Sequence, residues 1–356
     1  MNIIFDNIIF SLQKSGGISV YWFELISRFL KESEMDNLFL EGNEGGVNIF
    51  RNKLGIQSKY ILDSKDKYFI PRYRDVDLNI VDCKFIFHSS YYRTLSRKTK
   101  KYNKVRQVVT VHDFTYELFT KGIKKWTHTI QKKKAIKAAD IVICISENTK
   151  KDLLHFYPEF ASKDIRVIYN GVSEEYYTLP LNIKVNKKVC YFLFVGSRAS
   201  YKNFYFAIEA ISQTKDFVLK IVGPKLTEIE IELLNKYLSQ RWGFLENIDN
   251  SKLNQLYNEA FALLYPSSYE GFGIPLLEAM KTGCPFIAMN CSSIPEVAGE
   301  AGVLLENLSY DQFNIAIATI NKERNKIVSK GLEQANKFSW DKCYTETLKV
   351  YEELIK

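Results

Sequence analysis

Hydrophobic residues recur along this chain with two different spacings, and the two spacings alternate. Short runs of β-branched and aromatic residues predict strands, and longer stretches with apolar positions three or four residues apart predict helices. In the first half, the predicted strands are 2–5, 37–40, 85–88, 108–112, 141–145 and 167–169, and the predicted helices include 20–31 and 147–156. Strands that alternate with helices indicate βαβ units and a parallel sheet.

The alternation stops once, at the polar segment 173–188, and then restarts. The strands predicted after it are 190–195, 217–222, 241–245, 262–265 and 285–289, and the helices are 203–212, 228–238, 251–260 and 275–281. The sequence therefore predicts two α/β domains, 1–175 and 188–340, with the amphipathic helix 341–356 packing back on the first. Two doubly wound parallel sheets facing a cleft would bind ligands at the carboxyl ends of their strands.

Size and composition agree with two buried cores. The chain has 356 residues, of which 46% are hydrophobic and 14% aromatic, and one domain usually takes about 100–200 residues. No apolar run approaches the roughly 20 residues of a membrane-spanning helix. The opening "MNIIFDNIIF" has no basic segment before its apolar run, so it predicts a strand and not a signal peptide. Six cysteines without a CxxC pair predict reduced thiols and a cytoplasmic protein.

Basic residues are concentrated in the first half, although the whole chain carries a net charge of +8. The segments 93–106 and 124–140 hold much of this charge. Such segments are typical of proteins that meet nucleic acid, an anionic membrane surface or a phosphorylated substrate, and they are also typical of a solvated helix face. Nucleic-acid modules add stacking aromatic residues or a recognisable motif. Neither is arranged that way here, so we expect no nucleic-acid partner.

The segment "YEGFGIPLLEAMKTGCP" places one glutamate on each side of a glycine-rich turn. Proline favours the first helical position, so Pro275 predicts that Glu270 lies in a loop and Glu278 on the following helix. The glycines allow close approach of a ligand, and free amides at a helix start bind anions. Two carboxylates would then face neutral hydroxyl groups, which fits a nucleotide sugar. Alternatively, either glutamate complements the helix dipole.

A second candidate follows the strand predicted at 190–195. Gly196 ends this strand, and Arg198 and Lys202 come directly after it. Arginine offers a planar fork for phosphate oxygens, and lysine offers a mobile point charge. These cations at a strand end predict a phosphate site, with surface exposure as the simpler alternative.

The first domain offers two weaker signals. Gly16 and Gly17 stand immediately before a predicted helix, which suits the approach of a phosphate. His112 and Asp113 end the buried strand 108–112. A single histidine at a strand end is often structural, but the neighbouring Asp113 makes a functional role the better interpretation.

Taken in order, these motifs resemble those of a known family. "SGGIS", "FHSSYYR", "VHDFTYE", "ADIVICISENTKKDL", "VIYNGV", "VGSRASYKN", "IVGP" and "PSSYEGFGIPLLEAMKTGCP" resemble signatures of the retaining glycosyltransferases of family 4. The last contains the specific E-x7-E motif. The resemblance covers nearly the whole chain and implies the GT-B fold of two Rossmann-like domains facing a cleft.

The resemblance implies a role for each candidate residue. Glu278 would hold the donor ribose, and Glu270 would lie near the transferred sugar. Lys202 and Arg198 would neutralise the diphosphate; Ser197 stands where many relatives have the arginine. His112 would touch the donor sugar near the reacting carbon. The other donor-binding candidates are Gly16, Gly17, Gly196, Phe272, Gly273 and Ile274, and the acceptor-side candidates are Tyr91, Tyr92, Arg93 and Asp113.

Neither a metal nor another cofactor is expected. "DVD" at 75–77 is similar to the acidic triplet of the other common glycosyltransferase fold, but it does not follow an apolar strand. His88, His128 and His155 lack ligand spacing. Cations and helix amides can stabilise a leaving diphosphate without metal, and the family is thought to retain configuration by front-face substitution, without an enzymic nucleophile.

The resemblance predicts that a GDP-sugar, with GDP-mannose the best candidate, is the donor for a growing surface polysaccharide such as an O-antigen or a capsule. The acceptor is expected to be lipid-linked, at the inner face of the membrane, with residues 124–137 near anionic headgroups or acceptor phosphates. A UDP-sugar donor, a sugar-nucleotide hydrolase or epimerase, and a non-catalytic polyanion-binding protein are the alternatives.

Overall fold

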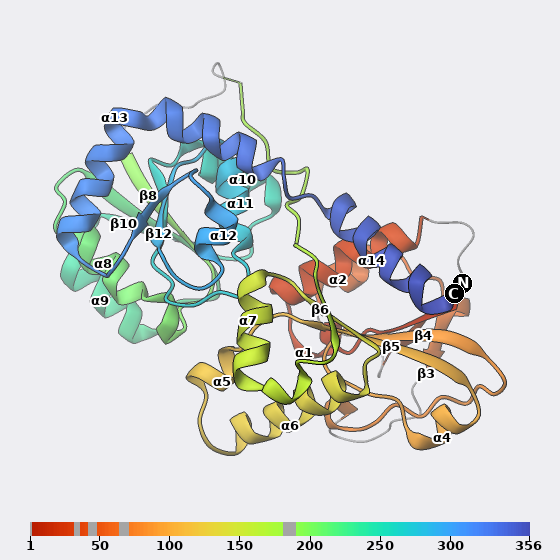
Figure 1. The fold of residues 1–356 in the computed structure, drawn as a ribbon. Coiled ribbons are helices and arrows are strands. Elements are labelled where there is room, and N and C mark those ends of the chain that lie inside the picture. Colours follow the sequence, from red (N-terminus) through yellow and green to blue (C-terminus); the bar gives the residue numbers. More distant parts are fainter. Residues whose placement is uncertain (1, 32–35, 42–47, 64–70, 181–189) are drawn as a thin grey trace. The chain divides into compact units, whose positions relative to one another are not determined.

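The computed structural model describes residues 2–31, 36–41, 48–63, 71–180 and 190–356 (Figure 1). The chain divides into two compact units, one formed by Met1–Asn170 with Trp340–Lys356 and the other by Gly171–Ser339. The boundary differs from the expected one, because residues 171–180 belong to the second unit instead of a linker. The backbone amides of Tyr177 and Leu179 donate to the side chains of Asn254 and Asn258 at 3.0 and 2.8 Å, which fixes this segment on the second unit.

The first unit is built on a seven-stranded parallel sheet with the order β3-β2-β1-β4-β5-β6-β7. The strands are β1 (Asn2–Asp6), β2 (Asp36–Glu41), β3 (Ile61–Asp63), β4 (Lys84–Ser89), β5 (Lys104–Val111), β6 (Ile141–Cys144) and β7 (Asp164–Val167). The helices are α1 (Ile9–Leu12), α2 (Gly17–Phe29), α3 (Ile49–Lys53), α4 (Arg97–Lys101), α5 (Thr115–Phe119), α6 (Gly122–Ala138), α7 (Glu147–Phe156) and α14 (Trp340–Ile355). The central strands are buried along most of their length, as expected for a sheet covered on both faces.

Helix α14 completes the core of the first unit, far in sequence from the rest of it. Tyr351 stacks on Phe29 of α2 with ring centroids 5.5 Å apart. Its hydroxyl forms a hydrogen bond with Nδ1 of His88 on β4. Burial lowers the pKa of His88 to about 3, so this ring is a neutral packing residue.

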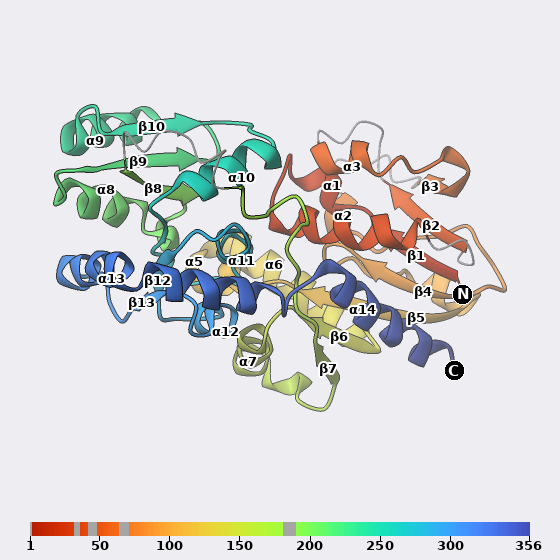
Figure 2. The same ribbon diagram turned by 90° about the horizontal axis from the view of Figure 1, so that it is seen from above.

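The second unit contains a six-stranded parallel sheet with the order β10-β9-β8-β11-β12-β13. The strands are β8 (Cys190–Val195), β9 (Phe217–Val222), β10 (Trp242–Leu245), β11 (Ala262–Tyr265), β12 (Phe286–Met289) and β13 (Val303–Leu305). The helices are α8 (Phe204–Ser212), α9 (Glu228–Leu238), α10 (Asn250–Glu259), α11 (Ile274–Lys281), α12 (Ile294–Ala298) and α13 (Tyr310–Ala335). Helices flank the sheets of both units (Figure 2). In the described residues no helix combines the length and apolar character that crossing a membrane requires.

Each sheet has one point where the strand order reverses. In the first unit it lies between β1 and β4, and in the second between β8 and β11. The connections that leave two such strands run to opposite sides, which opens a crevice beyond their carboxyl ends. The candidate residues after β1, β4, β8 and β11 therefore gather at these two crevices, one in each unit.

Candidate functional site

At the crevice of the second unit, Lys202 and Glu270 form an ion pair. Lys202 ends a short 3-10 turn after β8, and Glu270 lies in the loop after β11. Two hydrogen bonds join these loops, from the amide of Ser268 to the carbonyl of Tyr201 and from Nδ2 of Asn203 to the carbonyl of Pro266, both 2.8 Å. Both charged side chains are only about one-eighth exposed, at 13% and 12%. The fold thus brings these two predicted residues together.

The loop that carries Glu270 is held by two serines that the sequence analysis did not single out. The amide of Glu270 donates to Oγ of Ser292 at 2.9 Å. Oγ of Ser293 lies 2.9 Å from the carbonyl oxygens of both Glu270 and Phe272. Both serines precede α12, so a third loop fixes the turn. Only the side-chain geometry shows their role, because serine pairs before helices are common in any sequence.

Helix α11 begins at Ile274, one residue earlier than expected, so Pro275 takes the second helical position. Gly273 precedes it with φ of 110°, a backbone conformation that side chains rarely adopt. The ring of Phe272 is buried and lies 5.8 Å from the ring of Phe338. This anchor and the glycine place the amide of Ile274 at the end of a tight turn, where an anion would be stabilised. Pro275 has no N–H, and the amide of Leu276 donates to the carbonyl of Gly273 at 3.0 Å.

Glu278 lies on α11 and Glu270 in the preceding loop, on the separate elements that Pro275 predicted. The hydroxyl of Tyr257 donates to Oε2 of Glu278 at 2.8 Å. Burial raises the pKa of Glu278 to about 7, although hydrogen bonds from Tyr257 and Tyr176 lower it. This carboxyl group is therefore poised between its two protonation states near neutral pH.

Arg198 has a different environment from the one expected. Its Nε donates to Oε1 of Glu230 at 2.6 Å, and Nη2 donates to the carbonyls of Pro224 and Lys225 at 2.7 and 2.8 Å. The side chain is only 6% exposed. Glu230 also completes the capping box of α9 with Thr227. The guanidinium group thus fixes the turn between β9 and α9 through Nε and Nη2, whereas its buried Nη1 makes no hydrogen bond within the described residues.

Gly196 and Gly223 end the neighbouring strands β8 and β9. Gly196 has φ of 121°. A Cβ atom on Gly223 would lie 2.3 Å from the carbonyl oxygen of Gly196, far inside van der Waals contact. The close approach of these two backbones explains why glycine is needed at the end of the second strand as well as the first.

In the first unit, Gly16 caps α2 and Gly17 is its first residue. Oγ of Ser19 donates to the carbonyl of Gly16 at 2.9 Å. A Cβ atom on Gly17 would meet no heavy atom within 4 Å. The start of α2 is therefore open at Gly17, whereas a Cβ atom on Gly16 would lie 2.7 Å from Oε1 of Gln13.

His112 follows β5 and is buried, with its ring edge-to-face on Tyr21 at 5.0 Å. Burial lowers its pKa to about 4, so the ring is neutral at pH 7. Its Nε2 atom is buried and makes no hydrogen bond in the part of the chain that the structure describes. A buried polar nitrogen without a partner is uncommon, and it leaves this atom able to bind a ligand hydroxyl.

The acceptor-side candidates separate into two groups. Tyr91, Tyr92 and Asp113 line one cavity of about 260 Å³ together with Ile9, Leu12, Gln13, Ile18, Arg72, Thr115, Tyr116 and His128. The side chain of Arg93 is fully buried instead, and its Nη1 pairs with Asp6 on β1 at 3.3 Å. Arg93 is therefore held by the buried Asp6, whose carboxylate needs a cation, and it lines a second cavity and not the one that the other three share.

Comparisons with known proteins agree with this geometry in both units. Residues 15–176 match the family Glycosyltransferase Family 4, and residues 181–337 match Glycosyl transferases group 1. The chain belongs to glycosyltransferase family 4. Its two parallel-sheet units are those of the GT-B fold.

Three similar proteins show how far the likeness of this family 4 member extends. The O-antigen chain mannosyltransferase B of Escherichia coli is 31% identical over 172 residues, 45% of either chain. An uncharacterized glycosyltransferase of Methanocaldococcus jannaschii is 28% identical over 95% of both chains. A sucrose-phosphate synthase of Thermosynechococcus elongatus shares the fold with a TM-score of 0.77 at 18% identity, covering 100% of this chain and 99% of its own. The alignment thus spans about half the length of the O-antigen mannosyltransferase.

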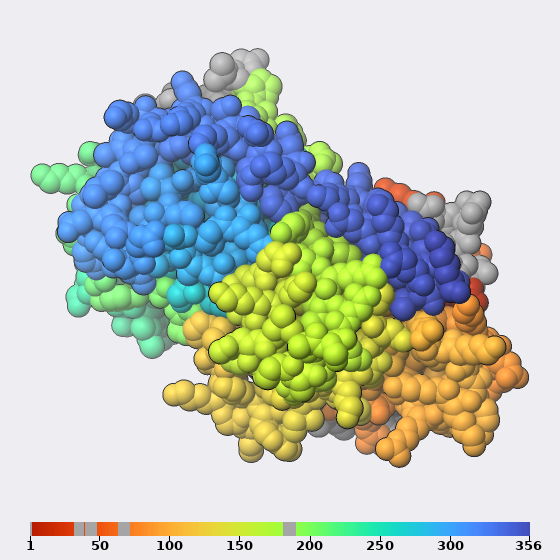
Figure 3. Space-filling view, in the orientation of Figure 1, coloured from red at the N-terminus to blue at the C-terminus, as the bar shows by residue number. Residues whose placement is uncertain are grey.

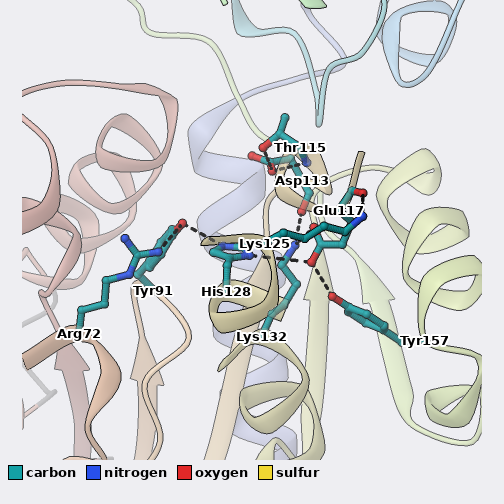
Figure 4. Close-up of polar contacts among 9 residues, drawn as sticks. All are labelled: Arg72, Tyr91, Asp113, Thr115, Glu117, Lys125, His128, Lys132 and Tyr157. Carbon is teal, nitrogen blue, oxygen red and sulfur yellow. Dashed lines mark hydrogen bonds and ion pairs between the residues drawn. The ribbon is translucent and has the colours of Figure 1, made fainter. Parts of the chain in front are cut away.

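A polar network in this family 4 member runs inward from the lining of the first unit's cavity, and sequence reasoning missed it (Figure 4). Nη2 of Arg72 lies 3.4 Å from the hydroxyl of Tyr91, which is 3.0 Å from Nε2 of His128. Nδ1 of His128 lies 3.9 Å from Glu117, and Nζ of Lys132 donates to the same carboxylate at 2.8 Å. The network connects the lining of the cavity to the buried face of α6.

Glu117 is the centre of this network. It ends the quoted motif "VHDFTYE", which was the one available signal for it. The hydroxyl of Tyr157 donates to Oε1 of Glu117, and Lys132 also donates to the carbonyl of Asp113 at 2.8 Å. Burial alone would raise the pKa of Glu117, but its contacts with His128, Lys132 and Tyr157 lower it to about 2. Glu117 is therefore ionised, and it holds a fully buried lysine beneath the cavity.

Proposed function

We propose that this protein is a retaining glycosyltransferase that moves mannose or a related sugar from a GDP-sugar to a growing surface polysaccharide. The observation that carries the proposal is the Lys202–Glu270 pair beside the start of α11, with Glu278 four residues into that helix. The ion pair and the helix start supply a cation and the amide of Ile274 for a diphosphate, and a carboxylate on either side of the turn for hydroxyl groups. Such a set suits a ligand with a phosphate centre and a sugar at each end.

In the proposed reaction, the bond between the anomeric carbon and the diphosphate oxygen breaks, and negative charge grows on the leaving diphosphate. Lys202 and the amide of Ile274 at the start of α11 are fixed donors, and donors aimed at developing charge supply much of catalysis. Glu278 accepts hydrogen bonds from the ribose, and Glu270 accepts from the transferred sugar. The acceptor oxygen bonds to the anomeric carbon on the face that the diphosphate leaves, and the leaving phosphate takes the proton of the acceptor hydroxyl, so configuration is retained.

From the first unit we propose His112 as a contact to the donor sugar, with the unpartnered Nε2 as the atom involved. The open start of α2 at Gly16 and Gly17 is proposed as a further phosphate contact. The cavity lined by Tyr91, Tyr92 and Asp113 is proposed as the acceptor site. Its aromatic and polar lining suits a sugar ring, which has apolar faces and hydroxyl edges.

We propose that the reaction needs no metal ion or other cofactor, because Lys202 and the amide of Ile274 would offset the charge of the diphosphate. In the described ranges, no three His, Cys, Asp or Glu side chains gather as metal ligands. The proposal is tested by turnover with a chelator present, which should leave the rate unchanged within about twofold, as expected when fixed protein donors supply the stabilisation.

The choice of donor is supported by the relatives. Two relatives are named as O-antigen chain mannosyltransferases. One is the Escherichia coli protein described above, and the other, from Salmonella typhimurium, is 30% identical over 196 residues. On this basis we propose GDP-mannose or a related GDP-sugar, with a UDP-sugar as the competing candidate. We further propose a lipid-linked acceptor of the O-antigen or capsule type, met at the inner face of the membrane.

Thermal unfolding with GDP, UDP, ADP and dTDP and their sugars tests the donor. A nucleotide at about a hundred times its dissociation constant raises stability by about 2.7 kcal/mol, so the matching base should stand out. The same preparations are then assayed for transfer to lipid-linked oligosaccharide and for hydrolysis without acceptor. Fast turnover of donor alone would exclude a transferase, and no response to any nucleotide would exclude the donor site.

A further inference from the structure

From Gly122 to Lys132, helix α6 buries polar side chains and exposes large apolar ones, the reverse of an ordinary surface helix, whereas Ala135 and Ile136 near its end are buried in the usual way. The side chains it buries in its middle are His128, Gln131 and Lys132. The side chains it exposes are Ile123 at 82%, Trp126 at 66% and Ile130 at 45%. A helix packed on a globular core normally turns its apolar stripe inward, so this arrangement calls for a cause on each face.

The cause on the inner face is the polar network that runs inward from the cavity lining. Lys132 is fully buried because Glu117 and the carbonyl of Asp113 accept its hydrogen bonds. His128 is buried because it contacts Tyr91 and stacks on Tyr116 at 3.8 Å. These contacts explain the polar inner face but give no reason for isoleucine and tryptophan on the outer one.

The outer face forms one continuous apolar stripe. Residues three and four apart lie on the same side of a helix, and Ile123, Trp126 and Ile130 have this spacing. Leu118 and Phe119, at the end of α5 just before α6, are each 44% exposed. Single exposed apolar residues are normal, whereas a contiguous patch marks an interaction site. Figures 1 and 3 show the golden-yellow α5 and α6 region at the lower edge of the first unit.

The surroundings of the stripe are basic. Residues 118–138 include seven lysines and no aspartate or glutamate. Lys121, Lys124 and Lys137 are exposed. The first unit contains 32 of the 49 lysines and arginines and 23 of the 41 acidic residues, a formal charge of +9 that leaves −1 for the second unit. A partner for this stripe must therefore be both apolar and negatively charged.

We propose that the outer face of α6, together with the end of α5, binds an anionic lipid surface, with Ile123, Trp126 and Ile130 inserted at the level of the headgroups. Tryptophan favours this interfacial depth, and flanking lysines are attracted to anionic lipids. The role of this contact rests on the proposed function, since a lipid-linked acceptor would be presented at such a surface. A second copy of the chain is a poorer occupant, because an isologous contact would bring two sets of lysines together.

Sedimentation with phosphatidylcholine vesicles, with and without phosphatidylglycerol, tests the proposal. The full chain should bind the anionic vesicles, and the triple variant Ile123→Ser/Trp126→Ser/Ile130→Ser should bind at least about tenfold more weakly, as expected when the inserted apolar area is removed. The control is Ile229→Ser/Ile315→Ser on α9 and α13, where the exposed fractions are 70% and 65%. This control should bind vesicles like the unchanged chain.

Two further measurements test the mode of binding. Lys121→Glu/Lys124→Glu should abolish the preference for anionic vesicles, whereas Lys322→Glu in the second unit should not. The tryptophan emission should shift to shorter wavelength on vesicles and should fail to shift in Trp126→Phe, since Trp22 and Trp340 are already buried and the half-buried Trp242 lies on β10 of the second unit. Circular dichroism shows whether each variant is folded, and Trp126→Phe alone suffices if the triple variant is not.

Unchanged vesicle binding by the triple variant, or by Trp126→Phe with an intact spectral shift, would overturn the proposal. So would self-association, seen by sedimentation without lipid, that the triple variant abolishes. Transfer to a detergent-solubilised acceptor separates this inference from the proposed function. A chain that transfers sugar in detergent but ignores vesicles refutes the lipid contact alone, and one that binds vesicles through α6 without transferring any sugar refutes the activity alone.

Discussion

Lys202 pairs with Glu270 although 68 residues separate them in the chain. The pairing follows from topology, because β8 and β11 are neighbours at the point where the strand order of the second sheet reverses. The two side chains are largely buried and hold each other in place. A diphosphate that binds Lys202 would take over one partner of this pair and release Glu270 toward the sugar.

Replacing Lys202 by alanine should lower kcat/KM for sugar transfer by about 10²–10³, the usual effect of removing one donor to a developing negative charge. The stabilisation of the fold by nucleoside diphosphate should fall with it. Lys215→Ala, an exposed lysine of the same unit, is the control for loss of charge. Unchanged kcat/KM in Lys202→Ala would remove this lysine from the site.

The carboxyl group of Glu278 should make stability depend on pH. Its pKa is raised to about 7 by burial, so the folded chain holds this proton more tightly than the unfolded chain. The contribution is therefore complete below about pH 4.5 and is lost as the pH rises through 7, an effect of about 3 kcal/mol in the free energy of unfolding.

The glutamine of Glu278→Gln cannot ionise, so this fall in the free energy of unfolding should be absent from the variant. Urea unfolding at several pH values between 5 and 8 should show that the free energy of unfolding of the variant rises relative to that of the unchanged chain as the pH increases. The exposed Glu352→Gln serves as the control and should keep a constant difference. A constant difference for Glu278→Gln would contradict the raised pKa.

Arg198 should matter more for folding than for turnover. Glu230→Gln removes the charge that holds the guanidinium group, and we expect it to lower the free energy of unfolding by about 1–3 kcal/mol. Arg198→Lys loses the forked geometry and should cost a similar amount. If Arg198→Lys folds normally but no longer transfers sugar, then the arginine binds the diphosphate after all.

The buried pair of Lys132 and Glu117 should be the most sensitive point of the first unit. Lys132→Met leaves the ionised Glu117 without its cation, which typically costs about 3–5 kcal/mol. Lys133→Met, at the next position, breaks the partly exposed pair with Glu159 and should cost less than about 1 kcal/mol. Urea unfolding of the two variants compares them directly, and equal losses would contradict the buried role of Lys132.

The regular part of the fold was readable from the sequence because buried parallel strands leave strong apolar runs. β8, β9 and β11 have the predicted bounds, as do α7 and α9. β7 was predicted at 167–169 but lies at Asp164–Val167, because this edge strand contains a salt-bridged Asp164 and Arg166 and so lacks an apolar run. β3 and β13 have only three residues each, too few to show a period.

The site was predictable only as far as residue type and place along the strands could show it. The sequence shows that Lys202 and Glu270 follow strands and that Glu278 lies on the next helix. From these places we could infer that all three lie at the carboxyl ends of the strands. The partners that engage Arg198 and Arg93 cannot be inferred in this way, since Glu230 and Asp6 are 32 and 87 residues away. Whether a cation is free or already paired depends on tertiary contacts that a single sequence does not reveal.

The return of α14 to the first unit also has a consequence for the order in which the chain folds. The ring of Tyr351 fills the core between Phe29 and His88, yet it is made 263 residues after His88. During synthesis the second unit can therefore form its core before α14, which completes the core of the first unit, has been made. Of the two units, the one whose first strand is made earlier is completed later, because it needs α14.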